Sequence, residues 1–163
     1  MLGNITGITD NGDVSRVFPL PNKKGMAVTA YNGSGGTFAI GQPVLLSNGS
    51  AAGLETTALA PATKAFPVWV GITIEASVAD TKIGKFQITG EVEALVDDTS
   101  TLATGAGLEV LNAGVALVTD GGTVVAATTA AYLRDAMTAA ENDGSPILKT
   151  VVLNGTPHTI AGS

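Results

Sequence analysis

The sequence predicts an all-β fold: a small β-barrel or sandwich of short antiparallel strands, with an extended N-terminal arm and at most one short helix. Short β-prone runs recur along the chain, and Gly- and Asn-rich turn clusters separate them about every ten residues. Hydrophobic residues make up 45% of the 163 residues and charged residues only 13%, so the chain can bury a core and exposes much neutral surface.

Residues 1–22 are predicted to form the arm, and residues 23–163 the barrel or sandwich domain. Large apolar residues are scattered through the arm without a helical or strand period, and its prolines favour an extended chain outside a ladder. The arm is either a frayed terminus or a segment that docks onto a neighbouring subunit. The apolar residues available for docking are Leu2, Ile5, Ile8, Val14, Val17, Phe18 and Leu20.

The domain contains a series of predicted strands. They cover residues 26–31, 37–40, 44–46, 66–74, 85–89, 91–96, 108–111, 115–118, 123–125 and 147–153. The segment 66–74 is apolar on both of its alternating sides, which suits a strand that is buried on both faces or that meets another subunit. Trp69, with Val68 and Val70 beside it, is therefore predicted to be a core or interface anchor.

The segment 129–142 allows two interpretations. Leu133, Met137 and Ala140 follow helical spacing, and Pro146 would prevent the helix from continuing. A weak internal similarity between 71–90 and 135–155 instead favours a strand near 133–140, because each stretch runs through an Asp- and Gly-containing turn into a Lys-bearing strand that ends in Gly. The strand is slightly preferred.

Composition and motifs argue against most catalytic and nucleic-acid functions. A net charge of −6 argues against nucleic-acid partners. The absence of cysteine excludes disulfides and thiolate metal sites. The doublet of Lys23 and Lys24 fits a solvated turn. His158 is the one histidine and has no orienting partner in its segment, so we expect no enzyme, catalytic residue, cofactor, metal or small-molecule substrate. No apolar stretch is long enough to span a membrane, and the first residues do not resemble a secretion signal.

A few acidic and glycine-rich segments are candidate binding sites. Glu91 and Glu93 project to one side of a strand, as a cation-binding or glycosidase pair would, although the solvated side of an edge strand is the favoured interpretation. Incomplete fragments of calcium loops occur at Asp10/Asp13 and Asp97/Asp98. The run 33–36 lacks the lysine of a phosphate-binding loop.

The order of the segments 27–46, 70–96, 103–118 and 147–153 resembles the small capsid decoration, or cement, proteins of tailed bacteriophages. The motifs VGITIEAS, GKFQITGEVEALV and ATGAGLEVLNAGVALV carry the resemblance. It implies a homotrimer on the outer capsid surface of the virion, assembled in the host cytoplasm, that bridges major capsid subunits and stabilises the head. The N-terminal extension would contact the shell.

Two other function classes remain open. The chain could be another assembly component, such as a head fibre base, a tail component or a surface-layer subunit. It could also be a carbohydrate-binding module that uses Trp69, Tyr31 and the pair Glu91 and Glu93.

Overall fold

The computed structural model describes residues 17–20, 24–48, 56–62, 68–97, 101–111, 113–119, 129–141 and 145–157. Over these residues the fold is all β, as predicted, with twelve strands and no helix, and therefore no helix that could cross a membrane. The strands are β1 (Val17–Pro19), β2 (Gly25–Asn32), β3 (Phe38–Ala39), β4 (Pro43–Asn48), β5 (Thr56–Leu59), β6 (Trp69–Thr73), β7 (Ser77–Val78), β8 (Ile83–Val96), β9 (Gly107–Val110), β10 (Leu117–Thr119), β11 (Ala131–Leu133) and β12 (Ile147–Leu153).

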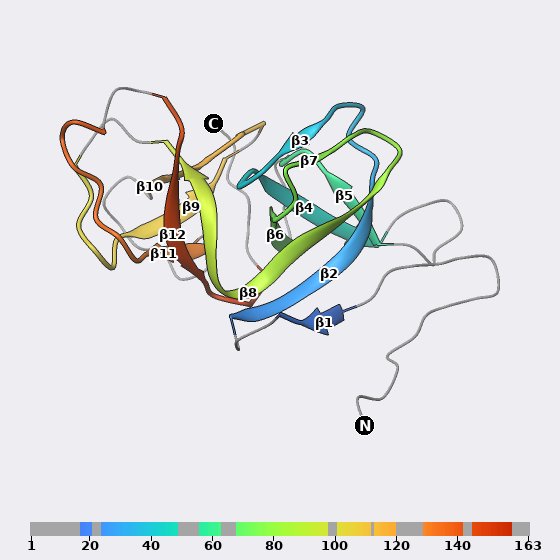
Figure 1. The fold of residues 1–163 in the computed structure, drawn as a ribbon, viewed down its shortest axis with the longest axis horizontal. Coiled ribbons are helices and arrows are strands. Elements are labelled where there is room, and N and C mark those ends of the chain that lie inside the picture. Colours follow the sequence, from blue (N-terminus) through green and yellow to red (C-terminus); the bar gives the residue numbers. More distant parts are fainter. Residues whose placement is uncertain are drawn as a thin grey trace.

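Ten strands form one sheet that closes on itself twice, while β3 pairs with β7 alone (Figure 1). The first ring runs β2-β5-β4-β6-β8 and closes through pairing of β8 with β2. The second ring runs β8-β10-β9-β11-β12 and closes through pairing of β12 with β8. The long strand β8 therefore belongs to both rings, and it crosses between the two lobes in Figure 1.

The two rings repeat one topology. In each, the strands taken in chain order close as first, third, second, fourth and fifth. The first and third strands pair in parallel, a departure from the expected all-antiparallel arrangement, and every other neighbouring pair is antiparallel. The internal similarity of the sequence falls on the segments that lead into the two fifth strands. Both segments also hold an ion pair to that strand, Lys85 with Glu75 and Lys149 with Glu141.

The helix interpretation of 129–142 is wrong. The strand β11 covers 131–133, and the chain then bends into a turn that touches the sheet again through a bridge between Met137 and Leu102. The backbone N–H groups of Leu133 and Met137 donate to Ala106 and Leu102 rather than to residues one helical turn earlier. Burial of Leu133 and Met137 explains the helical spacing, because both side chains reach the same core from a non-helical chain. The preferred strand is correct in kind but shorter and earlier than expected.

Two hydrophobic cores fill the rings, and β4 and β6 lie between them. Val44, Leu46 and Phe86 belong to the core of the first ring, where Phe86 packs edge-to-face against Phe38 at a centroid distance of 6.1 Å. On the opposite faces, residues of β4 and β6 join the core of the second ring; they are Leu45, Val70 and Ile72. The predicted burial of the 66–74 strand on both faces is therefore confirmed across 70–73.

The strand β8 changes direction at Gly90, where it passes from one ring to the other. Gly90 has φ +82°, and it pairs with Gly25 of β2 on one side and with Leu153 of β12 on the other. The Gln87 side chain secures this kink, since its Nε2 donates to the carbonyl oxygens of Lys24 (3.1 Å), Thr89 (2.9 Å) and Glu91 (2.8 Å). The first strand of the first ring and the last strand of the second ring thus meet at Gly90 of β8.

Candidate interaction surface

Three residues near the end of the predicted arm belong to the sheet. Val17–Pro19 form β1, which pairs antiparallel with β2, so the prediction of an extended chain outside a ladder is wrong for these residues. Pro19 is tolerated because β1 lies at the end of the strand order, where a missing N–H leaves no neighbour unpaired. Of the other predicted docking residues, Phe18 lies in β1 and Leu20 is half-buried just after it. The rest lie outside the described part of the chain; they are Leu2, Ile5, Ile8 and Val14.

Of the three predicted interface anchors, only Trp69 presents a surface. Val68 and Val70 are buried in the core of the second ring, whereas Trp69 is 41% exposed. Exposure of a large indole ring is unfavourable in water, so Trp69 is the member of this set that is available to a partner.

Trp69 and β1 line the same groove, which has a volume of about 290 Å³. Val17, 39% exposed, comes from β1, and Trp69 comes from β6. The rest of the described lining is mostly apolar and consists of Val28, Leu46, Thr56 and Ile88. Val17 of the predicted arm and Trp69 of the doubly apolar strand, which the sequence predicts as separate interface candidates, therefore line one groove.

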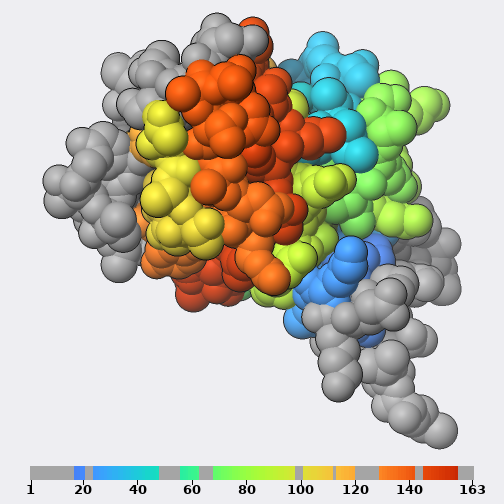
Figure 2. Space-filling model, turned by 60° about the vertical axis from the view of Figure 1, so that its left-hand side comes forward, coloured from blue at the N-terminus to red at the C-terminus, as the bar shows by residue number. Residues whose placement is uncertain are grey.

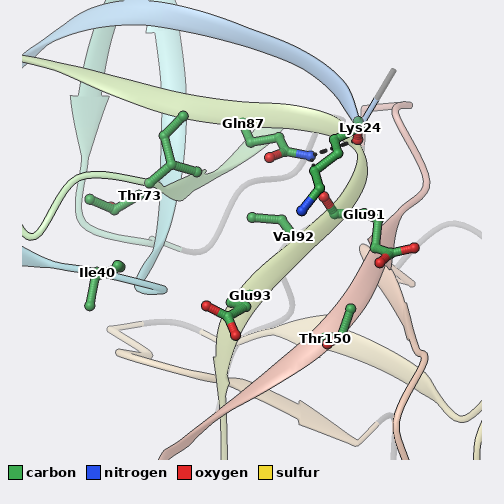
Figure 3. A pocket seen from close by; sticks show the side chains of 9 residues that line it. Lys24, Ile40, Thr73, Gln87, Glu91, Val92, Glu93 and Thr150 are labelled. Atoms are coloured by element: carbon green, nitrogen blue, oxygen red, sulfur yellow. Dashed lines mark hydrogen bonds between the residues drawn. The ribbon is translucent and has the colours of Figure 1, made fainter. Parts of the chain in front are cut away.

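A second depression lies between the two rings and is also about 290 Å³ in volume (Figure 3). Its lining comes from both rings: Lys24, Ile40, Thr73, Ile74, Gln87, Glu91, Val92, Glu93 and Thr150. In Figure 2 the orange and red surface of the second ring meets the cyan and green surface of the first, with part of β8 visible between them. We call this depression the inter-ring cleft.

Glu91 and Glu93 both line the inter-ring cleft, on a stretch of β8 that pairs with β12, whereas the pairing of β8 with β2 ends at Gly90. The Glu91 carboxylate is held by Arg134, with Nη1 and Oε2 2.5 Å apart. Glu93 makes no ion pair or hydrogen bond through its side chain to any described residue. The other members of the predicted carbohydrate site do not join this pair, since Trp69 lines the groove and Tyr31 lines neither depression.

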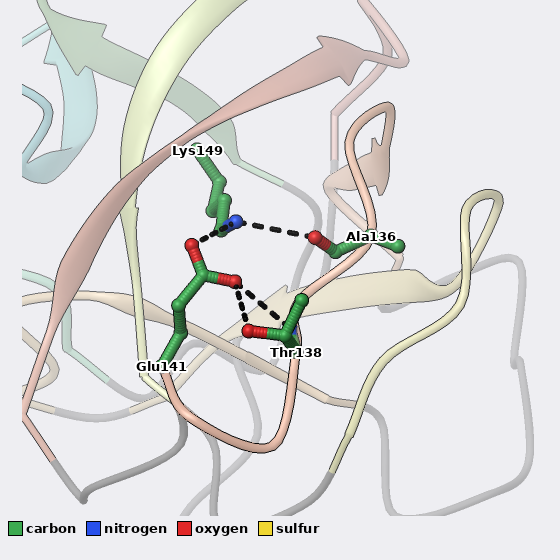
Figure 4. Close-up of polar contacts among 4 residues, drawn as sticks. All are labelled: Ala136, Thr138, Glu141 and Lys149. Atoms are coloured by element: carbon green, nitrogen blue, oxygen red, sulfur yellow. Dashed lines mark hydrogen bonds and ion pairs between the residues drawn. The ribbon is translucent and has the colours of Figure 1, made fainter.

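An ion pair between Lys149 and Glu141 secures the turn after β11 (Figure 4). Lys149 Nζ lies 2.6 Å from Glu141 Oε1 and donates to the Ala136 carbonyl at 3.1 Å. Thr138 donates to Glu141 Oε2 through its N–H (2.9 Å) and its hydroxyl (2.8 Å). Lys149 first, and then these two donors, lower the pKa of Glu141 from 4.5 to about 2. The arrangement stabilises a turn and leaves no group free for chemistry.

The remaining site predictions have no counterpart among the described residues. The described residues contain no group of three or more side chains that could hold a metal ion. The run 33–36 forms a turn secured by Asn32 and Ser34. Asp97 lies within the described chain, whereas Asp10, Asp13, Asp98 and His158 lie outside it. Sequence reasoning missed Gln87 and the cleft, because a single glutamine in a strand gives no signal of what it will bridge.

Comparisons with known proteins relate the fold to a phage protein. No protein-family model matches the chain, and no curated protein matches it significantly. Among solved structures, the chain is similar to the N base of the head fibre protein gp8.5 of bacteriophage phi29, with a TM-score of 0.50 and 13% sequence identity. The match covers 80% of this chain and 95% of that one. At this identity the similarity is one of fold: the chain shares the all-β architecture of a phage head fibre base.

Proposed function

We propose that this chain is a non-enzymatic structural protein of a phage virion that binds the outer surface of the head. It would bridge neighbouring major capsid subunits as a homotrimer and stabilise the shell. The observation that carries the proposal is the groove between β1 and β6, where the exposed Trp69 and Val17 lie at the foot of the arm. The fold that the chain shares with a phage head fibre base supports a place on the head.

The groove and the arm suit attachment to a large protein lattice. Apolar rings and aliphatic side chains in a partly open groove are the usual anchors of protein interfaces. An arm that continues from β1 adds contacts beyond the groove, and three linked copies raise the effective concentration of each contact at the next site. Attachment can then be stable without any single tight interface.

The test is co-sedimentation with purified heads that lack the protein. We expect the full chain to pellet with these heads, and a chain lacking residues 1–16, which keeps β1, to pellet much less. Trp69→Ser should weaken binding as well, because it removes the ring that lines the groove. The matched control is Ile83→Ser, at a position that is 51% exposed but does not line the groove.

Circular dichroism of each variant separates loss of binding from loss of folding. A full chain that never pellets with heads, or variants at Trp69 and Ile83 that bind equally well, would contradict the proposal. Light scattering on the purified chain tests the trimer, and a strict monomer would exclude it.

A second candidate function is a head fibre base, which the fold similarity favours specifically. A base would occupy a limited set of head sites and carry a further fibre segment, whereas a decoration protein would cover the lattice. Imaging of heads with gold-labelled protein distinguishes the two, since only the base gives label at the root of a projecting fibre.

A further inference from the structure

We propose that the inter-ring cleft is a binding site for a sugar unit, a hydroxyl-rich ligand without net charge. This inference is independent of the head-surface function, which concerns the groove on β1 and β6. The groups that carry it are the buried amide oxygen of Gln87 and the two side chains Lys24 and Glu93.

Gln87 supplies a buried acceptor that is not used within the described chain. Gln87 is only 3% exposed. The hydrogen bonds of its side chain are all donated by Nε2 to the carbonyl oxygens at the Gly90 kink. Oε1 accepts from no described residue, and Figure 3 shows it on the side of the amide away from Lys24, toward the space by Thr73 and Val92. An acceptor buried without a donor is unfavourable, so a hydrogen-bond donor of a ligand would be stabilised here.

Lys24 and Glu93 offer opposite charges on the walls of the same cleft without pairing to each other. Neither the Lys24 ammonium nor the Glu93 carboxylate makes an ion pair or side-chain hydrogen bond to a described residue. A ligand that both donates and accepts can therefore bridge them. Vicinal hydroxyl groups do this, accepting from the ammonium and donating to the carboxylate.

The cleft contains more acceptors than donors, which selects among bridging ligands. A ligand that brings a carboxylate of its own is disfavoured, because Glu91 and Glu93 place two negative charges on the lining against the single positive charge of Lys24. A sugar supplies several donors without a negative charge, and its C–H faces can pack on Ile40, Ile74 and Val92. A volume of about 290 Å³ is at the lower end of the range for small-molecule sites, as one or two sugar units require.

The cleft is preformed by hydrogen bonds at both of its ends. Glu91 N donates to the Lys24 carbonyl at 2.9 Å near the kink, and Leu95 N donates to the Gly41 carbonyl at 2.8 Å further along β8. Thr73 is also fixed, because its N–H and its hydroxyl both donate to the Gln42 carbonyl at 3.0 Å. A ligand would meet walls that need little reordering, which reduces the entropic cost of binding.

The test is an NMR titration of the ¹⁵N-labelled full chain with methyl glycosides of glucose, galactose, mannose and N-acetylglucosamine. We expect at least one of them to give saturable shifts at the backbone amides of Ile74, Glu93 and Thr150. Lys24→Met and Glu93→Gln should each weaken binding roughly 10-fold or more, since a hydrogen bond to a charged group contributes about 1.5–3 kcal/mol. Glu75→Gln is the matched control, because Glu75 pairs with Lys85 and does not line the cleft.

Additional measurements with immobilised oligosaccharides and with glycine distinguish the possible ligands. Stronger binding of immobilised oligosaccharides than of the methyl glycosides would identify a glycan chain as the source of the sugar, and equal binding would identify a free sugar; both support the site. No saturable shift with any sugar, shifts unaffected by both cleft variants, or shifts with glycine but with no sugar would each overturn the proposal. Head co-sedimentation of the same variants is measured separately, so failure of this site leaves the groove function untouched.

Discussion

Replacing Gly90 by alanine should destabilise the whole protein far more than the same change at another glycine with positive φ. Gly90 has φ +82°, and a Cβ there would lie 2.1 Å from the Lys24 carbonyl oxygen and 2.8 Å from Gly25 Cα. Both atoms belong to the backbone, so they cannot rotate away. Moving the Lys24 carbonyl would also disturb the bonds it accepts from Gln87 Nε2 and Glu91 N.

The magnitude follows from two separate contributions. A left-handed conformation costs an alanine about 1–2 kcal/mol, and forcing extra volume into a packed site costs about 1–3 kcal/mol. Gly35 has φ +78° but no atom within 4 Å of an added Cβ, so Gly35→Ala carries only the first contribution. We therefore expect a loss in the free energy of unfolding of about 2–5 kcal/mol for Gly90→Ala and about 1–2 kcal/mol for Gly35→Ala.

Urea unfolding followed by Trp69 fluorescence and by circular dichroism measures both variants. Trp69 is the only tryptophan and reports on the first ring, whereas circular dichroism reports on both rings. Because β8 belongs to both rings, the two signals should shift together. Equal destabilisation by the two substitutions would refute the reasoning, since it would mean that the close approach at Gly90 contributes nothing.

Three further outcomes are expected. The carboxylate of Glu141, with its pKa lowered to about 2, contributes stability that is complete above its ordinary pKa of 4.5 and is lost as the pH falls toward 2. Glu141→Gln should abolish this part of the pH dependence in urea unfolding between pH 5 and 2, and an unchanged slope would contradict the assignment. Phe86→Ala should lower the free energy of unfolding by about 3–5 kcal/mol, because it leaves a cavity beside Phe38; a calorimetric loss below about 1 kcal/mol would show that the ring is not packed as described. Gln87→Met should cost about 1–3 kcal/mol by leaving three carbonyl oxygens at the kink without their shared donor, and a variant as stable as the parent in chemical denaturation would rule out the amide clamp.

The strands that carry a regular alternation were predictable from sequence. The predicted strands 26–31 and 147–153 became β2 and β12, and 85–89 and 91–96 became the single strand β8. The predicted strands 108–111 and 115–118 became the antiparallel pair β9 and β10. The predicted strand 123–125 lies outside the described residues. The strands β5 and β7 were missed because each is short and draws its stability from neighbours rather than from its own pattern.

Closure of the sheet and assembly of the sites could not be predicted in the same way. Nothing local in β8 indicates that its two halves serve different rings, because the partners of each half lie far away in the chain. Lys24 and Gln87 are 63 residues apart and meet only through the pairing of β2 with β8. Val17 and Trp69 share a groove for a similar reason, since β1 pairs with β2 of the first ring and β6 belongs to that ring. Glu91 and Glu93 were recognised as a pair, but not as the wall of a cleft.

The sharing of β8 makes this architecture extensible. One strand ends the first ring and begins the second, so the repeating unit needs no linker and adds only four new strands for each ring. The last strand of the described residues, β12, is followed by Gly155, whose φ of +72° is close to the +82° of Gly90 at the kink. A designed chain that carried a strand onward from Gly155, as β8 continues beyond Gly90, could begin a third ring on β12 and grow into a rod of fused barrels whose length is set by the number of repeats.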